Sequence, residues 1–323
     1  MTIQQPGHFN RSDWRLMAIS LAVFLIYAFY ALSYVLLTPY PGIEVTSFAS
    51  GWLINDTVQE DLEIEDILVQ IGDLTYEQYR EDRLEVPFQG YQPGESVPNV
   101  IKADGETVTL VMPEPSVDDR LKRLVATLWF FPFWLAGTAI LLFLRPRDRR
   151  WQLLIATMYL TALWTVVGSI ANWQVGASRY LALIVGWAMV PVFLHLHITV
   201  PNPLKIKWHR PIVTAMYGIA LILAIVELLH LAVSSLSVVV IGLAILTSFG
   251  LLIYRTVSRR TPVSDRHSAR LMLAGLGLAF GPALLLFVFP LVSDISVPTA
   301  LALGIAFISL PILPISYTYA IYK

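Results

Sequence analysis

The stretch WRLMAISLAVFLIYAFYALSYVLL, residues 14–37, decides the class of fold, and Arg15 is its only charged residue. An α-helix rises about 1.5 Å per residue, so this run is long enough to cross the roughly 30 Å apolar core of a bilayer. It exceeds the apolar segment of a secretory signal peptide, and no small-residue cleavage site follows it. The stretch therefore predicts an uncleaved transmembrane anchor.

The composition of the whole chain agrees with a membrane protein. Hydrophobic residues make up 56% and charged residues 14% of its 323 residues, whereas soluble domains contain about 25% charged residues. This excludes a soluble enzyme, a disordered chain and a nucleic-acid-binding domain. The chain has no cysteine, which excludes disulfides, thiol catalysis and thiolate metal sites. We expect no cofactor.

Seven further apolar segments follow the first, which predicts a polytopic α-helical membrane protein of eight spans. They cover residues 124–144, 153–172, 180–200, 211–232, 235–254, 271–291 and 297–318. The expected organisation is a cytoplasmic N-terminus (1–13), a first transmembrane helix (14–38), an inserted extracytoplasmic domain (39–123), a seven-helix bundle (124–318) and a cytoplasmic end (319–323).

The distribution of charged residues predicts how the chain is oriented in the membrane. Residues 39–124 carry 18 acidic and 6 basic side chains, whereas the rest of the chain carries 5 acidic and 16 basic ones. Of those 16, only Arg179 lies on the same side as the acidic segment; the others are Arg11, Arg15, Arg145, Arg147, Arg149, Arg150, Lys205, Lys207, Arg210, Arg255, Arg259, Arg260, Arg266, Arg270 and Lys323. Basic loops stay in the cytoplasm, so both termini are predicted to be cytoplasmic. We expect an aromatic belt at the outer interface from Trp129, Trp134 and Trp173.

The acidic segment reads as a small, mainly β domain. Residues 43–48, 66–72 and 107–112 alternate like strands, and residues 75–83 favour a short helix. The stretch NVIKADGETVTLVMP, residues 99–113, predicts a hairpin with a type I′ turn at Asp104-Gly105. A dense acidic cluster at Glu60, Asp61, Glu63, Glu65 and Asp66 is either a solvated surface or a Ca²⁺ site, and its spacing does not fit an EF-hand.

The same segment resembles a bacterial PDZ domain. LEIEDILVQIGD, residues 62–73, matches most of that family's core motif, although Glu65 replaces its first glycine and Gly72 stands one place early. The resemblance implies a peptide-binding loop, for which ASGW at residues 49–52 is the nearest candidate. The ligand-binding candidates here are therefore Ser50, Gly51 and Trp52. The alternative is a PDZ-like fold used for packing or dimerisation.

The helical part resembles the sensor region of ComP-like bacterial sensor histidine kinases. MVPVFLHLHITVPNP (189–203) and LPISYTYAIYK (313–323) are similar to helix ends of that family, whose closing helix continues into a cytoplasmic dimerisation helix. The resemblance implies a two-component sensor module, a cytoplasmic kinase or effector as partner, and a homodimer. No phospho-acceptor helix or ATP-binding motif occurs in the 323 residues, so we expect this chain itself to be no enzyme.

Few polar residues lie inside the predicted spans. Glu227 and His230 share a helix face near the outer end of the fifth span, where they form either the floor of a ligand pocket or an interfacial pair. His195 and His197 are two residues apart, so only one is expected to point into the bundle, where it would bond to a neighbouring helix. The candidates for transmitting a signal through the last two spans are Gly277, Gly281, Pro290, Pro311, Pro314 and Tyr319.

The function expected from these observations is a membrane module that binds an extracytoplasmic peptide or small molecule and shifts the packing of its last helices. Its partners would be the lipid bilayer, the ligand and the effector, and no nucleic acid. Two alternatives stay open, a small-molecule or ion transporter and a PDZ-bearing membrane scaffold. An intramembrane protease is disfavoured because the chain lacks both an H-E-x-x-H and a G-x-S-x-G motif.

Overall fold

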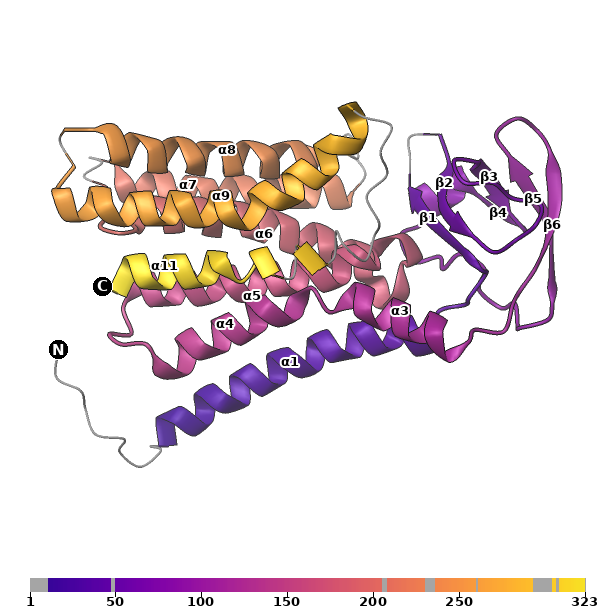
Figure 1. Cartoon of the computed structure of the whole chain (residues 1–323), viewed down its shortest axis with the longest axis horizontal. Helices are drawn as coiled ribbons and strands as arrows, with labels where there is room; N and C mark the ends of the chain where they lie inside the picture. Colours follow the sequence, from indigo (N-terminus) through magenta and orange to yellow (C-terminus); the bar gives the residue numbers. More distant parts are fainter. Residues whose placement is uncertain are drawn as a thin grey trace. The chain divides into compact units, whose positions relative to one another are not determined.

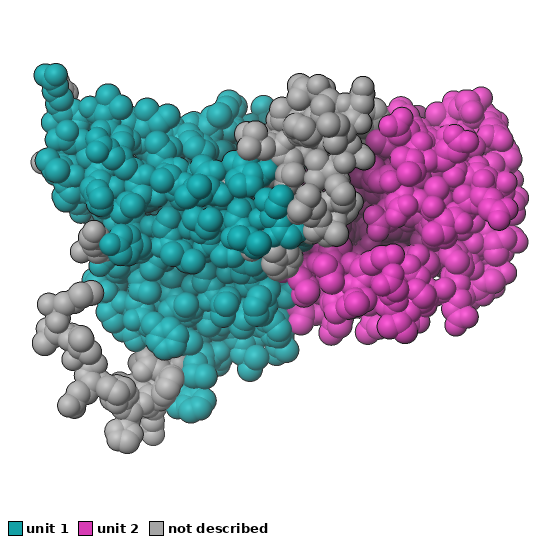
Figure 2. All heavy atoms as spheres, viewed as in Figure 1, with its two compact units in different colours: residues 1–25, 129–162, 185–323 teal, residues 26–128, 163–184 magenta. Residues whose placement is uncertain are grey.

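The computed structural model describes residues 11–47, 50–204, 208–229, 236–259, 261–292, 304–305 and 308–322. The chain divides into two compact units, coloured separately in Figure 2. Unit 1 comprises Met1–Leu25, Trp129–Ala162 and Val185–Lys323, and unit 2 comprises Ile26–Leu128 and Leu163–Ile184. The domain expected over residues 39–123 is thus part of a larger unit that includes helical segments.

Unit 2 contains one antiparallel sheet, ordered β1-β2-β3-β5-β6, with β4 paired to β3 (Figure 1). The strands are β1 (Ile43–Ser47), β2 (Trp52–Thr57), β3 (Ile67–Ile71), β4 (Leu74–Thr75), β5 (Ser96–Lys102) and β6 (Thr107–Val111). The expected strands are present, because alternating apolar residues such as Val108 and Leu110 face the core while their neighbours face solvent. The helical part and this sheet confirm a polytopic helical protein with a β domain.

The helix α2 (Tyr76–Glu81) follows the β3–β4 hairpin directly and confirms the expected short helix. It begins with a capping box, in which Thr75 accepts a hydrogen bond from the Gln78 backbone and Gln78 accepts one from the Thr75 backbone. Its Tyr76 and Tyr79 rings lie 4.9 and 5.0 Å from the ring of Trp52, which is fully buried. These three aromatic side chains anchor α2 to the sheet.

The hairpin between β5 and β6 is present, but its turn is not type I′. A type I′ turn needs positive φ at both central residues, and of the two only Gly105 has it, at +93°. Lys102 instead pairs with Glu106 across residues 103–105, and the Asp104 carboxylate accepts a hydrogen bond from the Glu106 backbone. The aspartate stabilises the turn through its side chain, so its own backbone needs no left-handed conformation.

The span expected over 124–144 is not one straight helix. Helix α3 (Val117–Thr127) and helix α4 (Phe130–Phe143) meet at a bend of 45°. Pro132 explains the break, because it has no N–H to bond the carbonyl of Leu128 and its ring would collide with that carbonyl. The Leu128 N–H bonds to Val125 instead, which closes α3 with a tighter turn.

Further helices are α1 (Arg11–Leu37), α5 (Arg149–Ser169), α6 (Ser178–Thr199), α7 (His209–Leu228), α8 (Leu236–Val257), α9 (Val263–Val292) and the shorter α11 (Ile312–Tyr322). Among the described residues, five helices are long and apolar enough to cross a membrane, or six if α3 and α4 form one span. This fits a multi-pass membrane protein, but it falls short of the expected eight. The expected last span, 297–318, lies partly outside the described residues.

Within unit 1, α9 packs against α8 and α11, and α11 also contacts α4. Helix α9 lies directly against α11 at Gly275, where a Cβ would overlap the Oγ and Cβ atoms of Ser316. Gly277 has no described residue within 4 Å of such a Cβ. Gly275 therefore permits the two helices to pack closely.

We predict that Gly275→Ala destabilises the protein and that Gly277→Ala does not. The added methyl group at residue 275 must push α11 away, which costs about 1–3 kcal/mol. At residue 277 the space is open and alanine favours the helix by up to about 1 kcal/mol. The free energy of unfolding, measured in detergent micelles, checks both, and equal effects of the two substitutions would contradict the packing described here.

Candidate functional site

The predicted ligand loop at residues 50–52 is mostly inside the β domain. Ser50 is exposed, whereas the ring of Trp52 is completely buried in the core. A Cβ on Gly51 would overlap the Leu68 carbonyl oxygen and the side chain of Ile67, because the backbone lies directly against β3. Two of the three residues thus pack the sheet, and ligand binding at Ser50 stays a prediction.

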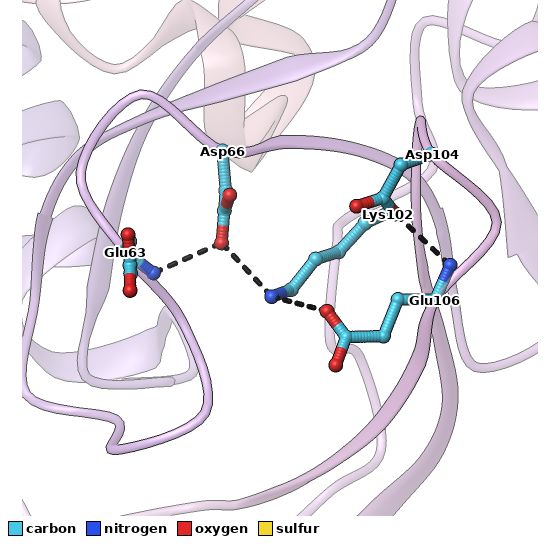
Figure 3. Close-up of polar contacts among 5 residues, drawn as sticks. All are labelled: Glu63, Asp66, Lys102, Asp104 and Glu106. Carbon is cyan, nitrogen blue, oxygen red and sulfur yellow. Dashed lines mark hydrogen bonds and ion pairs between the residues drawn. The ribbon is translucent and has the colours of Figure 1, made fainter.

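One residue of the acidic cluster around residue 60, Asp66, is paired with a lysine (Figure 3). Lys102 Nζ lies 3.2 Å from Asp66 Oδ2 and 2.7 Å from Glu106 Oε2, and Asp66 also accepts a hydrogen bond from the Glu63 backbone. The hydrogen bond to Glu106, more than any other contact, raises the pKa of Lys102. No three acidic or histidine side chains in the described ranges are placed to hold a metal ion, and Asp66 is used as a turn-forming and ion-pairing residue.

A different acidic region of unit 2 is hollowed into a pocket of about 670 Å³. It lies between the β3–β4 hairpin, α2 and the segment that leads to β5. Its lining contains five carboxylates and no basic side chain; the residues are Ile71, Asp73, Leu74, Gln78, Glu81, Asp82, Glu85, Val86, Phe88, Gln89, Gly90, Tyr91 and Glu95. A concave surface whose charged side chains all have one sign attracts a ligand of the opposite charge. The pocket cannot be recognised from the sequence, because its acidic residues are spread over 23 positions of mixed composition.

The connection between α5 and α6 is packed into the β domain. It consists of two short 3-10 helices, Ala171–Trp173 and Val175–Ala177, and Trp173 and Val175 belong to the hydrophobic core of the sheet. Trp173 was expected in an aromatic belt at the membrane surface. It is instead only 5% exposed, because the sheet covers it.

Tyr79 of α2 is the centre of the polar contacts to that connection. Its hydroxyl donates to the Asn172 carbonyl at 2.9 Å, and its own carbonyl accepts hydrogen bonds from Gln174 at 3.0 Å and from Arg179 at 3.2 Å. The guanidinium of Arg179 also lies 4.8 Å above the Tyr79 ring. The short helix beside the acidic pocket is thus bonded directly to the residues that begin α6.

The Arg123 cluster (Tyr34, Tyr40, Arg123 and Trp173) is a second group of contacts in unit 2. The Arg123 guanidinium lies 5.0, 4.9 and 5.4 Å from the three aromatic ring centres in that order. It donates hydrogen bonds to the carbonyls of Thr38 at 3.1 Å and Pro39 at 2.9 Å. Burial, followed by a hydrogen bond to Asp119, raises the pKa of Tyr40 to about 12.

Glu227 of α7 is buried in unit 1 and is held by two neighbours. Trp187 of α6 donates its indole N–H to Glu227 Oε2 at 2.7 Å, and Ser237 of α8 donates to Oε1 at 3.1 Å. The carboxylate therefore joins three helices, α6, α7 and α8. Its expected partner, His230, lies outside the described residues. The sequence alone could not identify Trp187 or Ser237, since they are 40 and 10 residues away.

Both histidines of α6 are buried, so the expectation that only one points inward is wrong. His195 Nδ1 lies 3.3 Å from the hydroxyl of Tyr217 on α7, and His197 Nε2 lies 2.7 Å from that of Tyr317 on α11. Helix α6 is covered on two sides, which allows inward positions two residues apart. Each histidine thus bonds to a different neighbouring helix, as expected of polar groups between helices.

Arg255 was expected in a basic loop but is a buried residue of α8. Its guanidinium donates to the carbonyls of His197 at 3.2 Å, Ile198 at 2.8 Å and Asn202 at 2.8 Å. These carbonyls belong to the end of α6 and the residues after it, where helix carbonyls have no partner within their own helix. Arg255 therefore closes the C-terminus of α6 from a neighbouring helix.

The predicted transmission residues are not brought together. Gly281, like Gly277, has no described residue within 4 Å of an added Cβ, and nothing is described of the side chain of Pro290. Pro311 precedes α11, Pro314 is buried in its first turn, and Tyr319 is 52% exposed. Tyr317, which the sequence did not single out, is the α11 residue bonded to α6.

Comparisons of the chain with protein-family models, with curated proteins and with solved structures found no match.

We predict that Arg123→Gln lowers the free energy of unfolding by about 2–4 kcal/mol, because it removes charged hydrogen bonds and cation–π contacts. Arg120→Gln is the matched control, since Arg120 is an exposed arginine of the same helix. Chemical unfolding in detergent, followed by the fluorescence of the tryptophans, measures both. A control as unstable as Arg123→Gln would show that charge alone matters.

We predict that Glu227→Gln leaves stability nearly unchanged and that Glu227→Leu lowers it. Glutamine can accept from Trp187 and donate to Ser237, whereas leucine leaves the buried indole N–H without an acceptor, at a cost of about 1–3 kcal/mol. Thermal unfolding of the two variants in the same detergent checks the difference. A glutamine variant as unstable as the leucine variant would mean that the negative charge itself is required.

Proposed function

We propose that this chain is a membrane signal-sensing module that binds an extracytoplasmic ligand and passes a conformational change to a cytoplasmic effector such as a histidine kinase. The observation that carries the proposal is the position of α2. Gln78 and Glu81 of this helix line the acidic pocket, and Tyr79, between them, is bonded to the α5–α6 connection. A ligand that moves α2 acts on that connection without any intermediary.

The acidic pocket favours a cationic ligand, namely a basic peptide or an amine. Five carboxylates without a basic neighbour in the lining raise the local concentration of cations. Leu74 and Phe88 also line the pocket, and they offer an apolar contact to an aliphatic or aromatic side chain of the ligand. The proposal therefore places the ligand at the pocket rather than at Ser50.

Helix α6 is the proposed route of the signal. It contributes residues to both units. Its first residues follow the connection held by Tyr79, and its last turn is bonded to α8 through Arg255 and to α11 through His197. A rotation or shift of α6 would change the hydrogen bonds of α11, which is the last described helix of the chain.

The finer assignments belong to the same proposal. The helix directly after the β3–β4 hairpin and the closing β5–β6 hairpin support a PDZ-like domain of the kind the sequence resembles. The basic residues between the apolar helices support cytoplasmic termini and an extracytoplasmic β domain. A homodimer and a ComP-like kinase partner follow from the resemblance of the helical part.

A transporter is the second candidate, and the buried Glu227 is the observation that favours it. Intramembrane carboxylates mark many ion and proton pathways. Proton-driven uptake into liposomes that is lost in Glu227→Gln would support this alternative. Sealed liposomes that contain the protein and show no proton-driven uptake would favour the sensor.

The test of the sensing proposal uses tetralysine as a cationic probe with the full chain in lipid nanodiscs. We predict salt-dependent binding that weakens about tenfold in the double variant Glu81→Gln/Glu85→Gln, because two charge contacts are lost. Binding should also slow amide hydrogen exchange in residues 171–179. The matched control is Glu60→Gln/Glu63→Gln, two exposed carboxylates outside the pocket.

Equal weakening in the control variant would show non-specific attraction and reject the pocket. Binding at the pocket that leaves exchange in residues 171–179 unchanged would retain the site and reject its coupling to α6.

A further inference from the structure

A second pocket, of about 770 Å³, lies in unit 1 where three helix ends converge. It is formed by the beginning of α5, the end of α6 and the first turns of α7. The residues that line it are Asp148, Arg149, Arg150, Thr199, Asn202, Pro203, His209, Arg210, Val213 and Thr214. Unlike the pocket in the β domain, its charged lining is mainly basic.

Two of its arginines are available to a ligand. Arg149 and Arg210 are exposed, and neither forms a hydrogen bond or ion pair through its side chain with another described residue. Arg150, in contrast, is already held by Asp148 at 2.7 Å and by the Pro201 carbonyl at 3.2 Å. The single carboxylate of the lining is thus neutralised within the protein, and two positive charges remain.

Polar atoms in the same lining have no partner. Thr199 is 5% exposed, and its buried hydroxyl forms no hydrogen bond with any described residue. The enclosed His209 Nε2 is unpaired as well. Leaving such groups buried without a partner costs free energy, so a group that bonds to them is favoured at this place.

Helix α7 adds further donors. It begins at His209, and its N-cap, Trp208, makes no side-chain hydrogen bond to the first turn. The first N–H groups of a helix point away from it and carry a partial positive charge, which binds anions. Guanidinium groups, a hydroxyl, an imidazole and an uncapped helix end are together a set of donors with few acceptors.

We propose that this pocket binds a phosphate group, carried by an anionic phospholipid or free in solution. A phosphate presents several acceptor oxygens and negative charge, which match two arginines and additional N–H and O–H donors. A basic pocket between the ends of membrane-spanning helices is suited to a lipid headgroup. The site is separate from the acidic ligand pocket and makes the helical unit responsive to phosphate-bearing molecules.

The test measures binding to the purified full chain in a neutral detergent with three probes: short-chain phosphatidic acid, short-chain phosphatidylcholine and inorganic phosphate. Isothermal titration calorimetry gives the Kd of each. We expect Arg149→Gln/Arg210→Gln to weaken phosphatidic acid binding about a hundredfold, because two charged contacts are lost at about tenfold each. Arg259→Gln/Arg270→Gln, which removes two exposed arginines outside the pocket, should leave the Kd unchanged.

Thr199→Val separates binding from folding. Valine has nearly the same shape and removes a hydroxyl without a partner, so the melting temperature of the ligand-free protein should hold or rise. Affinity for phosphatidic acid should fall about tenfold if that hydroxyl donates to the phosphate.

The probes distinguish the two sources. Inorganic phosphate that binds with the same sensitivity to Arg149→Gln/Arg210→Gln identifies the phosphate group as sufficient, and binding of phosphatidic acid alone identifies a lipid headgroup. Absence of binding by either probe, equal affinity for the zwitterionic phosphatidylcholine, or an equal loss in the two double variants would overturn the proposal.

Discussion

The structure of unit 2 depends on the hydrogen-bond acceptors and aromatic rings that the buried guanidinium of Arg123 requires. Arg123 is 7% exposed, and a charge taken out of water must be compensated by acceptors and by polarisable surroundings. Two carbonyls at the end of α1 and three aromatic rings meet that need. These groups come from α1, the segment before β1, α3 and the α5–α6 connection. The contacts of the single Arg123 charge therefore hold together four segments of the chain.

Buried charged groups also need hydrogen-bond partners in unit 1, where Arg255 and Glu227 are buried. Arg255 binds carbonyls at the end of α6, and Glu227 accepts hydrogen bonds from α6 and α8. Apolar side chains provide little specificity between helices in a bilayer, since lipid is equally apolar. The few buried polar groups therefore decide which helix faces which neighbour, and the low charge content of the chain makes each of them more important.

Local patterns in the sequence predicted the elements well. Alternation identified β1, β3 and β6, the charged stretch at 75–83 contained α2, and the long apolar runs identified α1 and α5 to α8. Partners were not predictable in this way. Hydropathy assigned Trp173 to a membrane surface and Arg255 to a loop, because both lie near the ends of apolar runs; in the folded protein a sheet and a helix terminus bury them. The acidic pocket was missed for a related reason, since its carboxylates converge only when α2 and the following segment fold over the β3–β4 hairpin.

The two ends of α6 use the same kind of contact, and this bears on how a signal could pass. Arg179 at its beginning, and Gln174 in the connection before it, donate to the carbonyl of Tyr79, and at its end Arg255 donates to the carbonyls of His197 and Ile198. Hydrogen bonds from charged or amide side chains to backbone carbonyls are directional, and a buried donor that loses its acceptor is costly. A shift of α6, as proposed, would therefore have to provide new acceptors for these donors, which favours a change between discrete arrangements over a continuous range. The proposed sensing by a shift of α6 needs no continuous polar path through the bilayer, whereas a transporter does, and the described spans supply few polar residues from which such a path could be built.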